Sequence, residues 1–133
     1  ACAIFGGVLK CWGSSTSGSI GDGTLSQRSS PVTINSGTSY DLVSAGNHTC
    51  GITSSSGTVL GGALRCWGNN ANGQLGDNTS TAKSTYVQAI GISNAIAAAA
   101  GSFHSVALRA DGRVYSAGGN QQGQLGSNSI NKE

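Results

Sequence analysis

Residues 66–79 read Cys66-Trp67-Gly68-Asn69-Asn70-Ala71-Asn72-Gly73-Gln74-Leu75-Gly76-Asp77-Asn78-Thr79. Earlier in the chain, residues 11–24 read Cys11-Trp12-Gly13-Ser14-Ser15-Thr16-Ser17-Gly18-Ser19-Ile20-Gly21-Asp22-Gly23-Thr24. Later, residues 116–126 read Ser116-Ala117-Gly118-Gly119-Asn120-Gln121-Gln122-Gly123-Gln124-Leu125-Gly126. A second landmark, Ala-Gly followed by His, recurs in phase at 45–48 and 100–104. The copies lie roughly fifty residues apart, a spacing typical of proteins built from structural repeats.

The composition indicates one ordered, turn-rich domain. The 133 residues are enough for a single domain. Only 9% of them are charged, but the 37% that are hydrophobic fall in regular short runs, which favours β-structure over disorder. The net charge of +2 is far from the basic footprint of nucleic-acid-binding proteins, so we expect no nucleic-acid partner. No run of about 18 apolar residues occurs, so we expect no membrane span.

The N-terminal residues predict a hairpin. Gly6-Gly7 separates two apolar runs, and a two-residue hairpin turn needs positive φ angles, which glycine adopts without strain. With the turn centred there, Cys2 lies opposite Cys11. Directly opposed residues of an antiparallel pair are close enough for a disulfide.

The second copy has the same arrangement of cysteines. Cys50 and Cys66 flank a hairpin with a longer loop at 53–62, and the third copy has Val106 and Ser116 at the corresponding positions. Both cysteines are therefore missing together from the third copy, as expected of a bonded pair.

We predict one disulfide in each of the first two hairpins, Cys2–Cys11 and Cys50–Cys66. The alternative is four reduced thiols in a cytosolic protein. The sequence has no Cys-x-x-Cys and no histidine pair at ligand spacing, so we expect no zinc or other metal site.

The segments between the hairpins predict further strands. Residues 31–34 are typical of an edge strand, because proline cannot donate to a sheet. Residues 40–46 and 95–101 occupy the same repeat position and each end in glycine, so we expect strands despite the helix propensity of the alanine run at 97–100. About four antiparallel strands and a polar loop per repeat describe the blades of a β-propeller.

On these motifs the chain resembles the regulator of chromosome condensation repeat family. The matching segments are Ala45-Gly46-Asn47-His48-Thr49-Cys50, Ala100-Gly101-Ser102-Phe103-His104-Ser105, Cys66-Trp67-Gly68-Asn69-Asn70, and Gly-Gln-Leu-Gly at 73–76 and 123–126. In that family such repeats build a seven-bladed propeller. The resemblance therefore implies an all-β fold: a propeller segment with about two and a half blades of antiparallel four-stranded sheets.

The chain departs from the family in its length. We interpret residues 1–133 as a single partial propeller, with an incomplete blade at 1–44, a full repeat at 45–99 and an incomplete blade at 100–133. Two full periods cannot close a seven-bladed ring, so we expect a piece of a longer chain or completion by other subunits. Open blade edges would then be available to a protein partner or to self-assembly.

The histidines and tryptophans of the repeats are interpreted as structural. His48 and His104 recur at one repeat position, and we expect each to hydrogen-bond a neighbouring backbone group. Trp12 and Trp67 each follow a strand cysteine, so we expect them to pack between blades rather than to stack on sugars or bases.

The loops after the tryptophans are predicted to be turns. Gly76 and Gly126 end Gly-x-x-Gly segments that lack the Gly-Lys-Ser/Thr of a phosphate loop. Asp22 and Asp77 follow such glycines and are expected to bond local amides, because one carboxylate per loop is too few for calcium. No set of acid, base and nucleophile converges, so we expect neither enzymatic activity nor a cofactor.

These observations lead us to expect an extracellular structural or protein-interaction module, such as a scaffold, adhesin or surface-assembly component. Paired cysteines and a low-charge polar surface fit a secreted protein. Binding is expected at loops 14–30, 53–62 and 69–84, because loops on a stiff scaffold usually carry it. Two alternatives remain from proteins of similar fold: a secreted inhibitor of enzymes such as β-lactamases, and a nucleotide-exchange regulator of a small GTPase.

Overall fold

Ten strands form three antiparallel sheets in the computed structural model, which describes residues 1–55 and 60–127. The strands are β1 (Cys2–Phe5), β2 (Val8–Gly13), β3 (Arg28–Thr33), β4 (Tyr40–Ala45), β5 (His48–Thr53), β6 (Leu64–Gly68), β7 (Lys83–Gln88), β8 (Ala95–Ala100), β9 (His104–Arg109) and β10 (Val114–Gly118). Every strand pair in these sheets is antiparallel. The predicted all-β class is confirmed.

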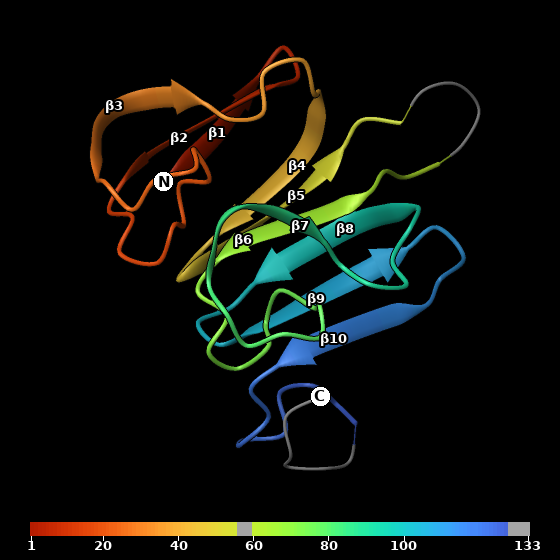
Figure 1. The fold of residues 1–133 in the computed structure, drawn as a ribbon. Coiled ribbons are helices and arrows are strands. Elements are labelled where there is room, and N and C mark those ends of the chain that lie inside the picture. Colours follow the sequence, from red (N-terminus) through yellow and green to blue (C-terminus); the bar gives the residue numbers. More distant parts are fainter. Residues whose placement is uncertain (56–59, 128–133) are drawn as a thin grey trace.

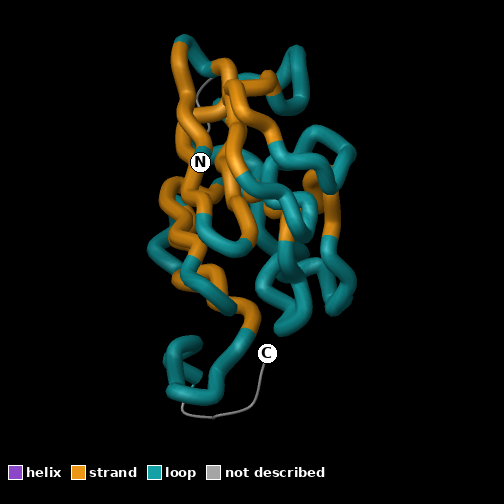
Figure 2. Tube along the Cα trace, turned by 90° about the vertical axis from the view of Figure 1, so that its left-hand side faces the viewer, coloured by secondary structure: helices purple, strands orange, loops and turns teal. Residues whose placement is uncertain are grey.

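The sheets follow one another in chain order. The first sheet has the order β1-β2-β3, the middle sheet β4-β5-β6-β7, and the third sheet β10-β9-β8 (Figure 1). Within the described residues there are strands, turns and loops but no helix (Figure 2), so none is long and apolar enough to cross a membrane. Four strands, the number expected of every blade, are found in the middle sheet, whereas three described strands make up each of the others.

The hairpin registers are those predicted from the sequence. Gly6 and Gly7 have φ angles of 55° and 79°, and the turn they form sets Cys2 opposite Cys11. Cys50 pairs with Cys66 in the middle sheet. Val106 pairs with Ser116 in the third sheet.

The sheets are offset from the sequence repeats. The repeat at 45–99 begins with the last residue of β4, but β4 pairs with β5 and therefore belongs to the middle sheet. The alanine-rich β8 likewise joins β9 in the third sheet. Small side chains let β8 lie against β4, where the Ala100 amide donates to Ser44 Oγ at 3.0 Å.

Two apolar clusters fill the spaces between neighbouring sheets. We call the space between the first and middle sheets the first junction, and that between the middle and third sheets the second junction. The first junction contains Leu9, Cys11, Ile20, Ile34, Tyr40 and Trp67. The second junction contains Cys50, Ile52, Leu64, Cys66, Leu75, Ala89, Ile92, Ala95 and Ala107. The core of this protein therefore lies between sheets, and each sheet needs its neighbour.

Candidate functional site

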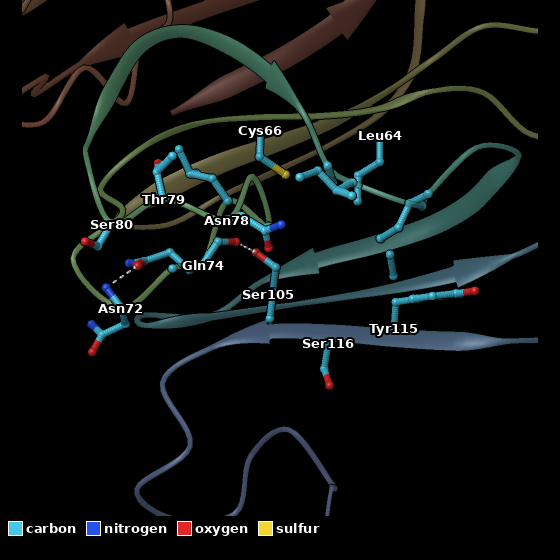
Figure 3. Close-up of a pocket in the computed structure, with 18 residues that line it drawn as sticks. Leu64, Cys66, Asn72, Gln74, Asn78, Thr79, Ser80, Ser105, Tyr115 and Ser116 are labelled. Carbon is cyan, nitrogen blue, oxygen red and sulfur yellow. Dashed lines mark hydrogen bonds between the residues drawn. The ribbon is translucent and has the colours of Figure 1, made fainter. Parts of the chain in front are cut away.

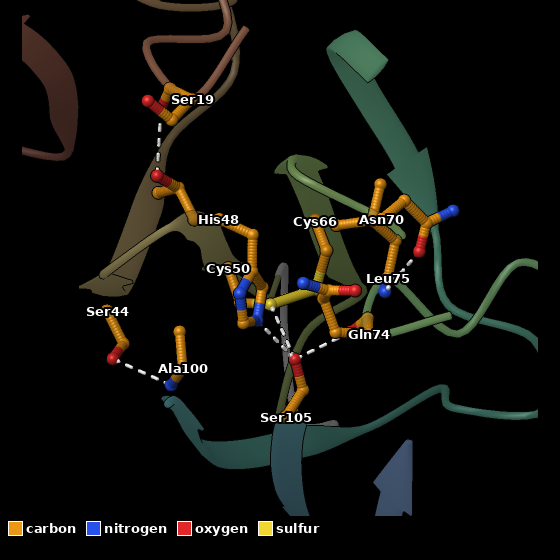
Figure 4. Close-up of a disulfide and its surroundings, with 11 residues drawn as sticks. Ser19, Ser44, His48, Cys50, Cys66, Asn70, Gln74, Leu75, Ala100 and Ser105 are labelled. Atoms are coloured by element: carbon orange, nitrogen blue, oxygen red, sulfur yellow. Dashed lines mark hydrogen bonds between the residues drawn. A yellow bond between two sulfur atoms is a disulfide. The ribbon is translucent and has the colours of Figure 1, made fainter. Parts of the chain in front are cut away.

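Both predicted disulfides are present, Cys2–Cys11 and Cys50–Cys66, each with a Cα–Cα distance of 4.1 Å. No cysteine in the described residues is free. Cys50 and Cys66 are buried at the second junction, beside His48 and Ser105 (Figure 4). The second disulfide therefore forms part of the contact between sheets.

A chain of hydrogen bonds connects the middle and third sheets. His48 Nε2 lies 2.6 Å from Ser105 Oγ, and the Ser105 hydroxyl donates to the Gln74 carbonyl at 2.7 Å (Figure 4). The hydroxyl has one proton, which is used on Gln74, so Nε2 must donate to Ser105. The partner of His48 is thus a side-chain hydroxyl and not the backbone group that was expected.

The His48 ring is buried and neutral. Burial, and secondarily the charge of His104, lowers the pKa of His48 to about 4. Its Nδ1 atom has no hydrogen-bond partner among the residues that the structure describes. No described carboxylate orients the ring as the acid of a catalytic triad would, and no described cluster of three His, Cys, Asp or Glu side chains is placed for a metal ion. The geometry favours a structural donor over a catalytic base.

His104 occupies the same repeat position but has different contacts. Its ring is half-buried and lies against Gly101, where an added Cβ would be 2.5 Å from His104 Cε1. The ring makes no hydrogen bond within the described residues. The hydrogen bond to a backbone group that was expected of both histidines is therefore absent for His104, as it is for His48. The two histidines are equivalent in sequence and not in contacts, because the hydroxyl of Ser105 comes from the third sheet.

The two tryptophans also differ. Trp67 is completely buried in the first junction, where Nε1 donates to the Ser19 carbonyl at 3.1 Å. Trp12 is only partly buried and lines a polar cavity of about 260 Å³ together with Thr16 and Asn47. Packing between blades, expected of both, is seen for Trp67 alone.

Three turn loops of similar structure follow β2, β6 and β10. We define them as residues 15–21, 70–76 and 120–126. In each, two glycine amides donate to carbonyls three residues earlier, at 2.9–3.1 Å. Asn70 Oδ1 also accepts the Leu75 amide at 3.0 Å, as Asn120 Oδ1 accepts the Leu125 amide at 2.9 Å. These bonds inside each loop hold its backbone in place without help from a ligand.

Gly76 and Gly126 end their loops with φ angles of 68° and 69°. Such left-handed angles favour glycine, which explains the repeated residue. They are turn glycines, as predicted.

The aspartates just after the turn loops bond local amides. Asp22 Oδ1 accepts the Thr24 amide and Asp77 Oδ1 the Thr79 amide, both at 3.0 Å. Burial acts to raise the pKa of each carboxyl, but hydrogen bonds from these threonines, with help from Arg28 and Lys83 respectively, outweigh it and lower the pKa. Each carboxylate therefore stabilises its own turn.

The second junction contains a partly open cavity of about 430 Å³, which sequence reasoning missed (Figure 3). Its wall includes Leu75, Ala89, Tyr115 and Ala117. The signal that could have revealed it is the change from Trp67 to Ala117 at the same repeat position. The part of loop 53–62 at 56–59, expected to bind a partner, lies outside the described residues.

Comparisons with known proteins agree with this architecture. Residues 62–108 and residues 95–124 match the Regulator of chromosome condensation (RCC1) repeat. The human E3 ubiquitin-protein ligase HERC2 is 32% identical over 122 residues, which are 90% of this chain and 2% of HERC2. The Protein RCC2 homolog of Danio rerio is 40% identical over 67 residues, which are 49% of this chain and 14% of that protein.

Solved structures show the same fold. Human WBSCR16 superposes with a TM-score of 0.78 at 24% identity, over 95% of this chain and 32% of that protein. Yeast RCC1 (Prp20), solved bound to Kap60, superposes with a TM-score of 0.73 at 21% identity, over 98% and 31%. The sheets described here are therefore blades of a β-propeller. With two repeat matches inside it, the chain belongs to the regulator of chromosome condensation repeat family.

Proposed function

We propose that this chain is an extracellular, non-enzymatic protein-interaction module whose binding surface is the end of the sheets that carries the three turn loops. The main observation behind this proposal is that the same two glycine amide-to-carbonyl hydrogen bonds occur in all three loops. A surface that is ordered before binding loses little conformational entropy when a partner docks.

The loops lie at one end of the molecule. Each follows the second strand of a hairpin, so it is at the end opposite to the hairpin turns at Gly6-Gly7 and at 110–112 (Figure 1). The loop tips Thr16, Ala71 and Gln121 are exposed. A partner can therefore reach three neighbouring tips at once.

The disulfides support an extracellular location. Disulfides persist in oxidising compartments and are rare in the cytosol, where glutathione keeps thiols reduced. All four cysteines of this chain are bridged. The scattered single charges of the sequence fit a secreted surface rather than a nucleic-acid interface.

Two solved structures of one neighbour, yeast RCC1 (Prp20), support a protein partner. Yeast RCC1 was solved bound to Kap60, and the structure of yeast Prp20p is described with its binding to Gsp1p and histones. These partners belong to that protein, of which the chain covers about a third. A nucleotide-exchange regulator of a small GTPase, the alternative that the family resemblance implies, is kept as the second candidate function.

Site-specific photo-crosslinking tests the proposal. A benzophenone amino acid is placed singly at Thr16, Ala71 or Gln121 in the full protein, and at Ala110 on the opposite end as the matched control. The proteins are exposed separately to the extracellular and to the cytosolic proteins of the host and irradiated. We expect one discrete protein adduct from the loop positions and none from Ala110.

The identity of the adduct separates the candidates. An extracellular structural or surface protein supports the proposal. A small GTPase whose nucleotide exchange is accelerated would replace it with the regulatory function. A secreted hydrolase inhibited at one-to-one stoichiometry would identify an inhibitor. Equal adducts from Ala110 and the loop tips would overturn the assignment of the surface.

A further inference from the structure

The two junctions have the same backbone plan and different fillings. Thr49 pairs with Trp67 in the middle sheet, and Ser105 pairs with Ala117 in the third sheet, so Ala117 corresponds to Trp67. The Ile34 amide donates to the Leu9 carbonyl at 2.9 Å, as the Ala89 amide donates to the Leu64 carbonyl at 3.1 Å. Ala89 therefore corresponds to Ile34.

The first junction is filled by large side chains. Trp67, Ile34 and Tyr40 are all buried there, with the Trp67 and Tyr40 rings 6.5 Å apart and edge to face. At the corresponding positions of the second junction stand Ala117, Ala89 and Ala95, since Tyr40 and Ala95 both begin the strand that pairs with the next hairpin. Three large side chains have thus been replaced by methyl groups.

The second junction stays open where Trp67 fills the first. An added Cβ on Gly21 would lie 2.5 Å from Trp67 Nε1, whereas one on Gly76 would find only Ala89 Cβ at 3.5 Å and Ala117 Cβ at 3.8 Å. The cavity of about 430 Å³ includes this space, and its size is within the range of small-molecule sites (Figure 3).

The wall of the cavity contains the Gln74 carbonyl, which corresponds to the Ser19 carbonyl that binds the Trp67 indole in the first junction. In the first junction the Ser19 carbonyl accepts two bonds, from Thr49 Oγ1 at 2.8 Å and from Trp67 Nε1 at 3.1 Å. The corresponding Gln74 carbonyl accepts the Ser105 hydroxyl at 2.7 Å and no second donor from the described residues. A carbonyl oxygen has two lone pairs, so Gln74 has room for one more hydrogen bond. Because Gln74 is fully buried, the wall around it must shift to admit a donor.

We propose that this cavity binds a flat aromatic ring with an N–H donor, an indole in the simplest case. The ring would occupy the position that Trp67 takes in the first junction, against Gly76, Ala89 and Ala117, and would donate to the Gln74 carbonyl. The wall residues Leu64, Leu75 and Tyr115 supply the apolar and aromatic surface that such a ring needs.

Titration of the full protein with indole tests this site. We expect saturable binding of one indole per chain, with NMR nuclear Overhauser effects to the methyl groups of Ala89 and Ala117. With 1-methylindole, which cannot donate to Gln74, the affinity should fall about tenfold, the value of one buried hydrogen bond. N-acetyltryptophanamide is the third probe. If it binds as tightly as indole, the ring can come from the tryptophan side chain of a partner protein. If it binds more weakly than indole, the ring comes from a free small molecule.

Filling the cavity from inside should abolish binding. Ala117→Trp restores the side chain of the first junction and should remove indole binding while raising Tm. Ala89→Ile fills less space and is the second variant, in case Ala117→Trp does not fold. Val114→Trp adds the same side chain at an exposed position of the same strand, β10, and should leave binding unchanged. The proposal is overturned if the wild-type protein does not saturate, or if folded Ala117→Trp or Ala89→Ile binds indole as well as Val114→Trp.

Discussion

His48 Nε2 donates to Ser105 Oγ across 2.6 Å, and the two residues belong to different sheets. The Ser105 hydroxyl in turn donates a hydrogen bond to the Gln74 carbonyl, in the loop after β6. One serine thus satisfies the donor of His48 and the acceptor of Gln74 at once. Because the ring is buried, each bond replaces contact with water that folding has removed.

Removing the hydroxyl should weaken the second junction. In Ser105→Ala the His48 N–H and the Gln74 carbonyl both lose their partner, and we expect the free energy of unfolding to fall by about 1–3 kcal/mol. Urea denaturation followed by tryptophan fluorescence measures the change. Ser102→Ala, at an exposed position, is the control and should change it by less than about 0.5 kcal/mol. Equal stability of Ser105→Ala and wild type would contradict this account.

Acid should destabilise the protein through His48. The pKa of His48 is about 4 in the folded chain and 6.5 ordinarily. Above pH 6.5 the ring is neutral in both states. Between pH 6.5 and 4 only the unfolded state binds the proton, so the free energy of unfolding falls by about 1.4 kcal/mol per pH unit, about 3 kcal/mol in all, and this contribution levels off below pH 4.

NMR titration of the histidine rings checks this expectation directly. A His48 resonance that titrates near pH 6.5 in the folded protein would refute it. In denaturation experiments at several pH values, His48→Gln should reduce the pH dependence in that window, whereas His104→Gln should retain the His48 contribution.

The two disulfides should differ in their effect on stability. Cys50 and Cys66 are 16 residues apart in sequence, and Cys2 and Cys11 are 9 apart. The entropy of loop closure then predicts a loss of stability of about 3 kcal/mol when Cys50 and Cys66 are changed to alanine, and of about 2.6 kcal/mol when Cys2 and Cys11 are changed. Thermal and urea unfolding of the two double variants measure these losses. A larger loss for the shorter loop would show that loop entropy does not control the difference.

Trp67→Ala should open the first junction. Truncation of a fully buried tryptophan costs about 3–5 kcal/mol, and the Ser19 carbonyl loses one donor. Trp12→Ala is the matched control, because Trp12 is partly exposed, and should cost less. Differential scanning calorimetry gives both values. Similar losses in the two variants would contradict the difference in burial.

The sequence was sufficient to predict the hairpins and insufficient to predict the contacts between sheets. Gly6-Gly7 and the opposed cysteines determine a register locally, so Cys2–Cys11 and Cys50–Cys66 followed from spacing. The partner of His48 is 57 residues away, in another sheet, and no local pattern indicates it. Repetition suggested equal roles for His48 and His104, but contacts across a junction depend on the neighbour's residue and not on the repeat alone.

Trp12, Trp67 and Ala117 illustrate a second limit. The repeated motif predicts one role for both tryptophans, and it gives no role to the alanine that stands at the same position of the third copy. The small volume of the Ala117 side chain indicates a cavity only when this position is known to face a neighbouring sheet. That orientation follows from the alternation of side chains along β10, which needs the pairing of Ser105 with Ala117.

The hydroxyl-to-carbonyl bonds are the same in both junctions, Thr49 to Ser19 at 2.8 Å and Ser105 to Gln74 at 2.7 Å, although one interior is full and the other hollow. These hydroxyl-to-carbonyl bonds are thus compatible both with a filled and with an open interior. Mutation can therefore empty or refill one interior while the hydroxyl-to-carbonyl bond of that junction is kept. Each junction of such a protein is in this sense an independent site at which a new binding specificity can evolve.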